Sequence, residues 1–375
     1  MARHPAAFIR GGTSKALVFH SCDLPEDRAE RDAIYLRAMG SPDRYGRQLD
    51  GMGGGISSLS KVCVVGPATV PDADVDYTFV QVQIGEARCD YSGNCGNMSS
   101  AIGPFAVDEG LVAAPSGATG LVRIHNTNTG TIIHASFPVR DGRSVEAGEL
   151  EIPGVDGSGA PVRLDFLAPG GASTGRLLPT GQALDTLVLP DGRRIGASLV
   201  DAANACVFVA AESLGASGTE RPDELGANGT LMQALGRLRL QASVAMGIAG
   251  SIEAAAATPM IPLIAIVSPP RPSRALDGQE IPADACDLVV RMLSNGQPHR
   301  ALPLTGSLCT AVAAQIDGTL PHRFARRSAG PLRLAMPSGV LTVEADVVHN
   351  AAGWQALRGS FFRTTRRLFD GFVYS

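Results

Sequence analysis

Residues 10–19 read RGGTSKALVF, residues 200–209 read VDAANACVFV, and the two decapeptides align without a gap. Further along, residues 95–102 (CGNMSSAI) and 305–312 (TGSLCTAV) share a second pattern. In both, a glycine-containing turn precedes a helix of small residues that closes at Asp-Glu-Gly or Asp-Gly. Either match alone is weak in a chain rich in alanine and glycine. Two matches in the same order predict an internal duplication into two pseudo-symmetric domains.

The length of the chain also favours two domains. Its 375 residues exceed the roughly 250–300 that one hydrophobic core usually serves. We expect an N-terminal domain over residues 1–185 and a C-terminal domain over residues 186–354, with the terminal segment, about 355–375, free to return to the first domain. The seam is expected near Gly181–Gly196, where Pro, Gly and Asp cluster.

Strand-like runs outnumber helix-like ones. Runs rich in β-branched residues and bounded by Gly, Pro or Asp predict strands at Ala16–His20, Val62–Val65, Tyr77–Ile84, Leu121–Ile124, Thr131–Phe137, Ala205–Ala210, Leu263–Val267 and Gly339–Val347. Small or apolar residues at helical spacing predict helices at Pro25–Met39, Asn97–Glu109, Thr230–Met246 and Ser307–Asp317. Strand clusters interrupted by isolated helices are typical of the α+β class, not of a regular βαβ alternation.

Composition excludes several classes of function. A net charge of −4 gives no basic surface for nucleic acid or for an anionic membrane, and no apolar run approaches the roughly 18 residues of a membrane span. The N-terminus has no signal-peptide pattern. Seven scattered cysteines with no CxxC pair predict neither a disulfide framework nor a zinc site, so we expect a cytoplasmic protein without a metal.

The chain contains 30 arginines and only two lysines, Lys15 and Lys61. Codon bias in a GC-rich genome explains such a ratio, but it should also remove any lysine that arginine can replace. A lysine that persists indicates a need for a compact amine that can lose its proton.

Lys61 begins a strand that is predicted to be buried. Burial disfavours an ammonium group, so a lysine there can act as a general base near neutral pH. The alternative is a lysine whose charged end reaches water from the strand end. The preceding loop, Asp50–Gly55, includes Gly54 and can fold its backbone over a ligand, which favours the catalytic interpretation.

Cys95 lies at the N-terminus of a predicted helix, where the thiolate form is stabilised, so that the side chain can serve as an acid or a base. The alternative, a small buried apolar residue, suits Cys63, Cys206 and Cys286 within apolar runs. The glycines and asparagines around Cys95 are not core residues. His125 and His134 lie on neighbouring strand-like segments, and without a third ligand or a nearby carboxylate we interpret them as structural.

Two predicted helix starts, at Gly93–Asn97 and Thr305–Ser307, can bind carboxylates through unpaired backbone N–H groups. The candidate donors are Asn94, Gly96, Asn97, Met98, Thr305, Gly306 and Ser307. The turn Thr13-Ser14-Lys15 can add two hydroxyl groups and a charge, although an ordinary capped turn has the same composition.

Together these motifs resemble the PrpF family. The segments that carry the resemblance run nearly from end to end: Arg10–Lys15, Asp50–Gly54 with Ser60-Lys61, Ser92–Asn97, Ser268–Pro270, Thr305–Ser307, Pro337–Gly339 and Arg363–Arg367. The resemblance implies a diaminopimelate-epimerase-like fold, in which each of two domains wraps a curled sheet around a central helix and the active site lies between them. It also implies a catalytic pair, Lys61 and Cys95, and the isomerisation of aconitate, methylaconitate, methylitaconate or oxalomesaconate without a cofactor.

One departure from the wider superfamily bears on the reaction. That superfamily uses two cysteines, one before each central helix, and here Thr305 takes the place of the second. Cys309 lies about one turn inside the helix, too far from its start to substitute. This argues against a racemase of amino acids, which stays an alternative together with a non-catalytic partner of an aconitase-like dehydratase. A homodimer is expected by frequency alone.

Overall fold

A computed structural model describes residues 2–91, 94–113, 117–258, 261–294, 296–326, 330–351 and 353–375. The chain divides into two compact units: unit 1 is Met1–Asp165 with Phe362–Ser375, and unit 2 is Phe166–Phe361. The passage between the units therefore lies at Asp165 and Phe166. The stretch Gly181–Gly196, where the sequence suggested a seam, instead leads into a hairpin within unit 2.

Unit 1 contains a mixed, mainly antiparallel sheet. Its strands are β1 (Arg3–Gly11), β2 (Ser14–His20), β3 (Lys61–Pro67), β4 (Val75–Val82), β5 (Cys89–Asp90), β6 (Thr119–Asn126), β7 (Thr131–Arg140), β8 (Arg143–Ser144) and β23 (Thr365–Tyr374). β9 (Leu150–Glu151) and β10 (Ser158–Gly159) form a separate antiparallel pair. β1 and β2 form an antiparallel hairpin, β2 pairs parallel with β3, β3 antiparallel with β4, β4 parallel with β6, and β6 antiparallel with β7. β23 closes the other side of β1.

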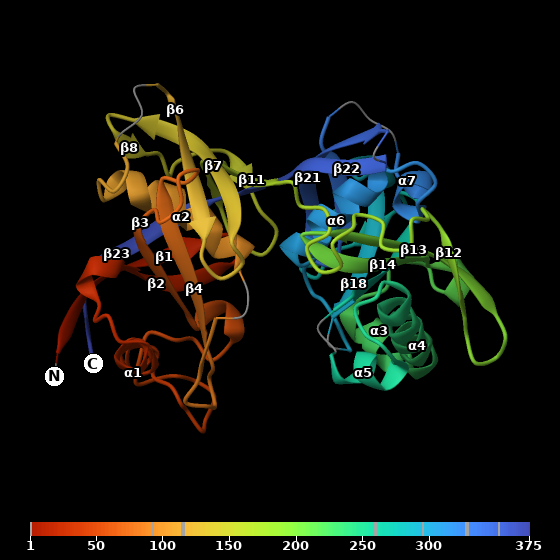
Figure 1. Cartoon of the computed structure of the whole chain (residues 1–375), viewed down its shortest axis with the longest axis horizontal. Helices are drawn as coiled ribbons and strands as arrows, with labels where there is room; N and C mark the ends of the chain where they lie inside the picture. The colour runs from red at the N-terminus through yellow and green to blue at the C-terminus, as the bar shows by residue number, and fades with distance from the viewer. Residues whose placement is uncertain are drawn as a thin grey trace. The chain divides into compact units, whose positions relative to one another are not determined.

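Two α-helices pack on this sheet. α1 (Arg28–Met39) begins at Asp27, whose carboxylate accepts the Glu30 N–H, and ends at Gly40 in the left-handed conformation. α2 (Gly96–Asp108) is buried along most of its length and contacts β1, β6 and β7, so it is the central helix of the unit (Figure 1). Short 3-10 turns lie at Ser21–Asp23 (η1) and Ser57–Leu59 (η2).

Unit 2 repeats the order of unit 1. Its strands are β12 (Asp185–Val188), β13 (Arg194–Ala202), β14 (Asn204–Ala210), β15 (Leu263–Ser268), β16 (Ser273–Arg274), β17 (Glu280–Ile281), β18 (Leu288–Ser294), β19 (Gln297–Pro298), β20 (Leu332–Met336) and β21 (Gly339–Asn350). β13 and β14 form a hairpin, β14 pairs parallel with β15, β15 antiparallel with β18, β18 parallel with β20, and β20 antiparallel with β21. β11 (Val162–Leu167) and β22 (Gly353–Arg363) each include a point where the chain passes between the units.

The helices of unit 2 also follow this plan. α6 (Leu304–Ala314) lies between β19 and β20 in the chain, as α2 lies between β5 and β6, and it is the central helix of the unit (Figure 1). The remaining helices are α3 (Pro222–Ala227), α4 (Gly229–Ala245), α5 (Ile252–Ala257) and α7 (Leu320–Phe324), with 3-10 turns η3 (Glu212–Leu214) and η4 (Ala283–Ala285). One order of strands and helices in both units confirms the predicted duplication and the α+β class.

Each run predicted as a strand or helix contains an element of that type, with ends that differ by a few residues. Among the elements that the sequence analysis missed are β1 and β23. β1 includes Pro5 and charged residues that weaken a strand pattern, and it is stabilised by pairing with β2 and with the distant terminal strand β23.

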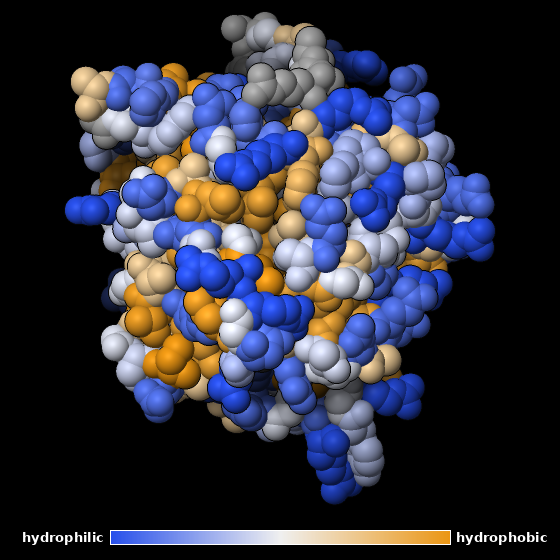
Figure 2. Space-filling model, turned by 90° about the vertical axis from the view of Figure 1, so that its right-hand side faces the viewer, coloured by the Kyte–Doolittle hydropathy of each residue, from blue (hydrophilic) through white to orange (hydrophobic). Residues whose placement is uncertain are grey.

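Figure 2 shows one face of the molecule, on which apolar areas are broken up by polar and charged side chains. Among the helices of the described residues, none is both long and apolar enough to cross a membrane.

Candidate active site

The two faces of strand β3 have different roles. Val62 and Val64 belong to the hydrophobic core beneath α1. Alternate residues of a strand point to opposite faces, so Lys61 and Cys63 lie on the other face, and their cross-strand partners there are Gln81 and Phe79. This second face, which we call the α2 face, is covered by the central helix, since α2 contacts β3 as well as β1, β6 and β7.

Lys61 is almost completely buried on the α2 face, with 7% of its surface exposed. Its Nζ donates a 2.7 Å hydrogen bond to Oε1 of Gln81 and lies 4.8 Å from the centre of the Phe79 ring. No carboxylate forms an ion pair with Lys61 among the described residues. The amine thus has an uncharged hydrogen-bond partner, and the face of the Phe79 ring lies within cation–π distance of it.

Cys95 is the N-cap residue of α2 and is partly exposed, with a free thiol. Its carbonyl oxygen accepts hydrogen bonds from the backbone N–H and the hydroxyl of Ser99, at 2.9 and 3.1 Å. The Cys95 side chain makes no capping hydrogen bond, so the N–H groups of the first helical turn are not satisfied by it. The preceding Asn94 accepts a 3.3 Å hydrogen bond from the Ser99 hydroxyl.

Cys63 interacts electrostatically with both Lys61 and Cys95. Burial is the main cause that raises the pKa of the Cys63 thiol; Cys95 raises it further, and Lys61 opposes the shift. Burial also raises the pKa of Tyr77 well above its ordinary value, with contributions from Cys63 and Cys95. Lys61, two residues from Cys63 on β3, and Cys95, at the start of α2, therefore both lie within electrostatic range of the Cys63 thiol.

The turn between β1 and β2 packs against the start of α2. The Asn97 side chain donates to the Thr13 hydroxyl at 3.1 Å and accepts from the Thr13 N–H at 3.4 Å. Its Oδ1 also accepts from Nε of Arg363 at 3.1 Å. Gly12 has φ +51°, and a Cβ on it would lie 2.2 Å from Asn97 Oδ1. Only glycine allows this approach, which fixes the hydroxyl of Thr13 beside the helix start.

Arg363 is a buried cation at this helix start, with 6% of its surface exposed. Burial lowers the pKa of its guanidinium to about 9. Met98 packs against the same turn: a Cβ added to Gly11 would lie only 3.2 Å from the Cα of Met98. Positive charge and helix N–H groups therefore meet at Gly96–Met98, as in an anion site.

The glycine-rich loop before Lys61 is held by Gln48, which is 1% exposed. The Gln48 side chain accepts from the Gly55 N–H at 3.0 Å and donates to the Ser60 hydroxyl at 2.7 Å. Gly54 is exposed and packs on Leu59, whose Cδ1 would lie 2.6 Å from an added Cβ. Gln48 therefore ties this loop to the residue that precedes Lys61.

The residues Ser14 and Lys15 separate onto the two faces of the sheet. Ser14 is buried and, by strand alternation with Val18 and its partner Cys63, lies on the α2 face. The Nζ of Lys15 lies 5.6 Å from the centre of the Phe8 ring, and Phe8 belongs to the core beneath α1. The structure brings Ser14 to the α2 face with Lys61 but does not bring Lys15 there.

The second predicted anion site is the first turn of α6. Pro303 is its N-cap residue, and the N–H and hydroxyl of Ser307 both donate to the Pro303 carbonyl, as those of Ser99 do to Cys95. Thr305 accepts a 3.5 Å hydrogen bond from Asn204 at the β13–β14 turn, much as Asn97 bonds to the β1–β2 turn. When the two helix starts are aligned by these hydrogen bonds, Pro303 corresponds to Cys95. The sequence alignment instead pairs Cys95 with Thr305, which lies two residues further along the chain.

In either match, unit 2 has no thiol at the position that corresponds to Cys95. Ser307 is fully buried and its hydroxyl is bonded to Pro303, so its side chain is committed to the helix start. Gly306 faces Met292, whose Sδ would lie 2.4 Å from an added Cβ. Cys309 donates to the Val200 carbonyl and is completely buried.

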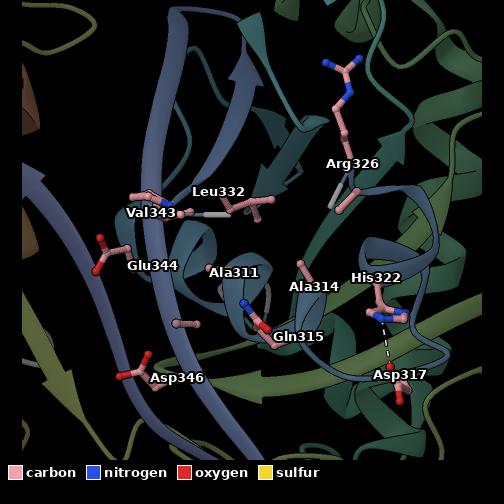
Figure 3. Close-up of a pocket in the computed structure, with 14 residues that line it drawn as sticks. Ala311, Ala314, Gln315, Asp317, His322, Arg326, Leu332, Val343, Glu344 and Asp346 are labelled. Atoms are coloured by element: carbon pink, nitrogen blue, oxygen red, sulfur yellow. Dashed lines mark ion pairs between the residues drawn. The ribbon is translucent and has the colours of Figure 1, made fainter. Parts of the chain in front are cut away.

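A pocket in unit 2 lies at the other end of α6 and is separate from these residues (Figure 3). Ala311, Ala314 and Gln315 line it from the helix, opposite Val343 and Glu344 of β21. His322 and Asp317 form a 3.0 Å ion pair at its edge (Figure 3). It shares no residue with the first turn of α6.

His125 does have a carboxylate nearby, because Asp76 lies 2.9 Å away on the neighbouring strand, but Asp76 also accepts from Thr69 and the pair is part of the sheet surface. Ser92 and Gly93 of the cysteine motif lie outside the described residues. Across the described residues, no group of three or more His, Cys, Asp or Glu side chains is arranged to hold a metal ion.

The whole sequence, residues 1–375, matches the family described as PrpF protein. The chain is a member of the PrpF family. It is 41% identical to a 3-methylitaconate isomerase of Eubacterium barkeri, covering 99% of this chain and 97% of the relative. It is 37% identical to a 2-methyl-aconitate isomerase of Shewanella oneidensis (98% and 96% covered) and to a 4-oxalomesaconate tautomerase of Pseudomonas putida (99% and 96% covered).

Solved structures agree with this membership. A crystal structure of methylitaconate-delta-isomerase superposes on this PrpF protein with a TM-score of 0.91 at 39% identity, covering 99% of this chain and 95% of the other. A hydroxyproline epimerase of Agrobacterium vitis superposes with a TM-score of 0.51 at 12% identity (99% and 92% covered), which supports the epimerase-like fold alone.

Sequence reasoning missed two residues of this PrpF protein that touch the candidate site, Gln81 and Arg363. Gln81 had a signal, since it continues the alternation Tyr77, Phe79, Gln81 along a predicted strand and thus places an amide on the buried face. Arg363 had none beyond the terminal arginine motif, because its contact with Asn97 joins residues 266 positions apart.

Proposed function

We propose that this PrpF protein isomerises a small unsaturated di- or tricarboxylate of the aconitate, methylaconitate, methylitaconate or oxalomesaconate type, without a cofactor. The observation that carries the proposal is the placement of Lys61, a buried amine paired with an amide, in the same neighbourhood as the thiol of Cys95 at a helix start. The named activities of its relatives support the choice of substrate class.

In the proposed reaction, the neutral amine of Lys61 removes a proton from the carbon that lies between an alkene and a carboxylate or carbonyl group. The electron pair of the broken C–H bond delocalises into a dienolate. Return of a proton at the far carbon moves the double bond, whereas rotation before return exchanges cis and trans forms. Cys95 supplies that proton or is a polar neighbour of the group that does.

The start of α2 is suited to hold the negative charge. Backbone N–H groups of Gly96, Asn97 and Met98 point out of the helix end, and the helix dipole favours an anion there. We assign a substrate carboxylate to these groups, with the hydroxyls of Thr13 and Ser14 and the side chain of Asn94 as further contacts. Thr305 and Gly306 are proposed to bind a carboxylate through their backbone N–H groups, whereas both the N–H and the hydroxyl of Ser307 are already bonded to the Pro303 carbonyl.

Two other functions make different demands. An amino-acid epimerase needs a second acid or base opposite Cys95, and neither Pro303 nor Thr305 can serve as one near neutral pH. A non-catalytic partner of a dehydratase has no use for a buried amine beside a thiol. We also expect a homodimer in the reducing cytoplasm, where seven free cysteines are stable.

A panel assay in deuterium oxide tests the proposal. Chelator-treated protein is mixed with each unsaturated acid, and NMR follows the appearance of the isomer and the incorporation of deuterium at the allylic carbon. Turnover of at least one acid supports the proposal. Deuterium incorporation only at the α-carbon of an amino acid would favour the epimerase, and no exchange with any acid, together with tight binding to a dehydratase, would favour the partner role.

A further inference from the structure

The side chain of Gln81 has a fixed orientation beside Lys61. Its Nε2 donates to two backbone carbonyls, Ser60 at 2.8 Å and Ser57 at 3.1 Å. Because carbonyls can only accept, the amide nitrogen must face them and the oxygen must face Lys61. The 2.7 Å contact between Gln81 Oε1 and Lys61 Nζ is therefore one in which the amine donates.

This arrangement affects which protonation state the amine can use. An amide oxygen accepts one N–H from either the ammonium or the neutral amine. A neutral amine that donates one N–H to Gln81 keeps its lone pair directed elsewhere. A carboxylate in the same place would stabilise the ammonium by its charge and would weaken the base.

The strand that carries Gln81 is itself firmly held. Asn128 accepts from the Phe79 N–H at 2.7 Å and donates to the Phe79 carbonyl at 2.9 Å. Across the sheet, Gln81 is the register partner of both Lys61 on β3 and Asp90 on β5. The amide and the Phe79 ring therefore approach Nζ from a rigid strand.

Other ionisable groups near Lys61 come from each neighbouring element. They are Cys63 on its own strand, Tyr77 on β4, Asp90 on β5, and Cys95 at the start of α2. Asp90 lies 3.6 Å from Nη1 of Arg88, which offsets its charge. Gln81 separates Lys61 from Asp90 in the register of the sheet.

We propose that Gln81 is a positioning residue for Lys61: its fixed amide holds the amine by one N–H, directs the lone pair, and keeps a negative charge away from Nζ. The inference rests on the proposed function of Lys61 as the base. It assigns to Gln81 no contact with the substrate.

The two lysines of the chain allow a direct test. Protein labelled with lysine carrying ¹³C at Cε gives two side-chain signals, and the variant Lys15→Arg identifies the one from Lys61. In Gln81→Glu, the midpoint of the Lys61 titration should move to higher pH by about 1–3 units, the effect of an opposite charge within hydrogen-bonding distance. Gln83→Glu is the matched control, with the same charge change two residues along the chain, and its shift should be much smaller.

Kinetics on the best acid of the panel supply the second readout. In Gln81→Glu, the acid limb of the kcat/KM profile should follow the shift of the Lys61 signal, so activity lost near pH 7 returns at higher pH. Gln81→Met, which keeps the length of the side chain but not the acceptor, should lose about 10–100-fold in kcat at every pH because the amine is misplaced. Circular dichroism checks that both variants are folded.

The outcomes separate the two proposals. Equal Lys61 titrations in Gln81→Glu and Gln83→Glu, with an active wild-type protein, would overturn the role of Gln81 and leave Lys61 as the base. Full activity in Gln81→Met would overturn it as well. If the wild-type protein isomerises none of the acids while the Gln81→Glu shift is present, the proposed function fails and the role of Gln81 in catalysis fails with it.

Discussion

Replacing Gly12 with alanine tests the packing of the β1–β2 turn on the start of α2. The added Cβ would lie 2.2 Å from Asn97 Oδ1 and 2.9 Å from Cδ of Arg363. Since such contacts need more than 3 Å, the Asn97 side chain must turn away. It would then lose its hydrogen bonds with Thr13 and with Arg363.

The expected cost combines two contributions. The left-handed backbone at φ +51° is unfavourable for alanine by about 1–2 kcal/mol. The hydrogen bonds of Asn97 contribute about 0.5–1.5 kcal/mol each, partly recovered through water. We therefore expect Gly12→Ala to lower the free energy of unfolding of unit 1 by about 2–4 kcal/mol. Activity should also fall, because Thr13 and the N–H groups of α2 lose their alignment.

Gly110→Ala provides the matched control. Gly110 has φ +71°, and an added Cβ there would meet no atom within 4 Å, so only the backbone contribution of about 1–2 kcal/mol remains. Hydrogen–deuterium exchange of the amides of α2 measures the opening free energy of unit 1 directly. Fluorescence does not serve, because the single tryptophan, Trp354, belongs to unit 2. Equal losses in Gly12→Ala and Gly110→Ala would refute the packing argument.

Two further predictions concern the thiol of Cys95 and the stability of the fold at low pH. Cys95→Ser places a hydroxyl at the helix start and should lower kcat/KM by about 10–100-fold, which is less than the loss caused by removing the base. The control Cys22→Ser, which changes an exposed thiol, should leave kcat/KM unchanged. An inactive Cys95→Ser enzyme would show that the thiol is the indispensable group. Asp287 is completely buried, and although burial alone would raise its pKa, hydrogen bonds from Arg333 hold that pKa below its usual range. The stabilisation by Asp287 is therefore present above about pH 4 and lost as the pH falls through the lowered pKa. Urea unfolding should show Asp287→Asn less stable than wild type by about 1–3 kcal/mol at pH 7 and a smaller difference at pH 3; a constant difference would contradict the assignment.

The duplication was predictable because it follows local patterns. A glycine turn before a run of small residues specifies a central helix, and β-branched runs specify the strands around it, without knowledge of distant contacts. The pairing of β1 with β23 joins the two ends of the chain and had no local signal. For the same reason the buried position of Arg363 beside Asn97 could not be predicted.

The candidate site was predictable by residue type more than by geometry. Lysine scarcity singled out Lys15 and Lys61 equally. The predicted burial of Lys61 and the glycine-rich loop before it favoured Lys61 as the base, and the strand register shows that the two side chains lie on opposite faces. Strand alternation alone already implies that Ser14 and Lys15 point to opposite faces, a constraint that the sequence analysis did not use. The sequence alignment paired Cys95 with Thr305 because the small residues of the two segments resemble each other. The hydrogen bonds of Ser99 and Ser307 show that the structural counterpart of Cys95 is Pro303.

The most direct test of Lys61 as the base is the exchange of the allylic proton in deuterium oxide by Lys61→Arg and Lys15→Arg. Arginine keeps the positive charge but cannot lose a proton near pH 7. Lys61→Arg should exchange the proton about 10²–10⁴-fold more slowly than the wild-type protein, the usual effect of removing a general base, while Lys15→Arg should exchange it at the wild-type rate. Near wild-type exchange by a folded Lys61→Arg protein would contradict the assignment of Lys61.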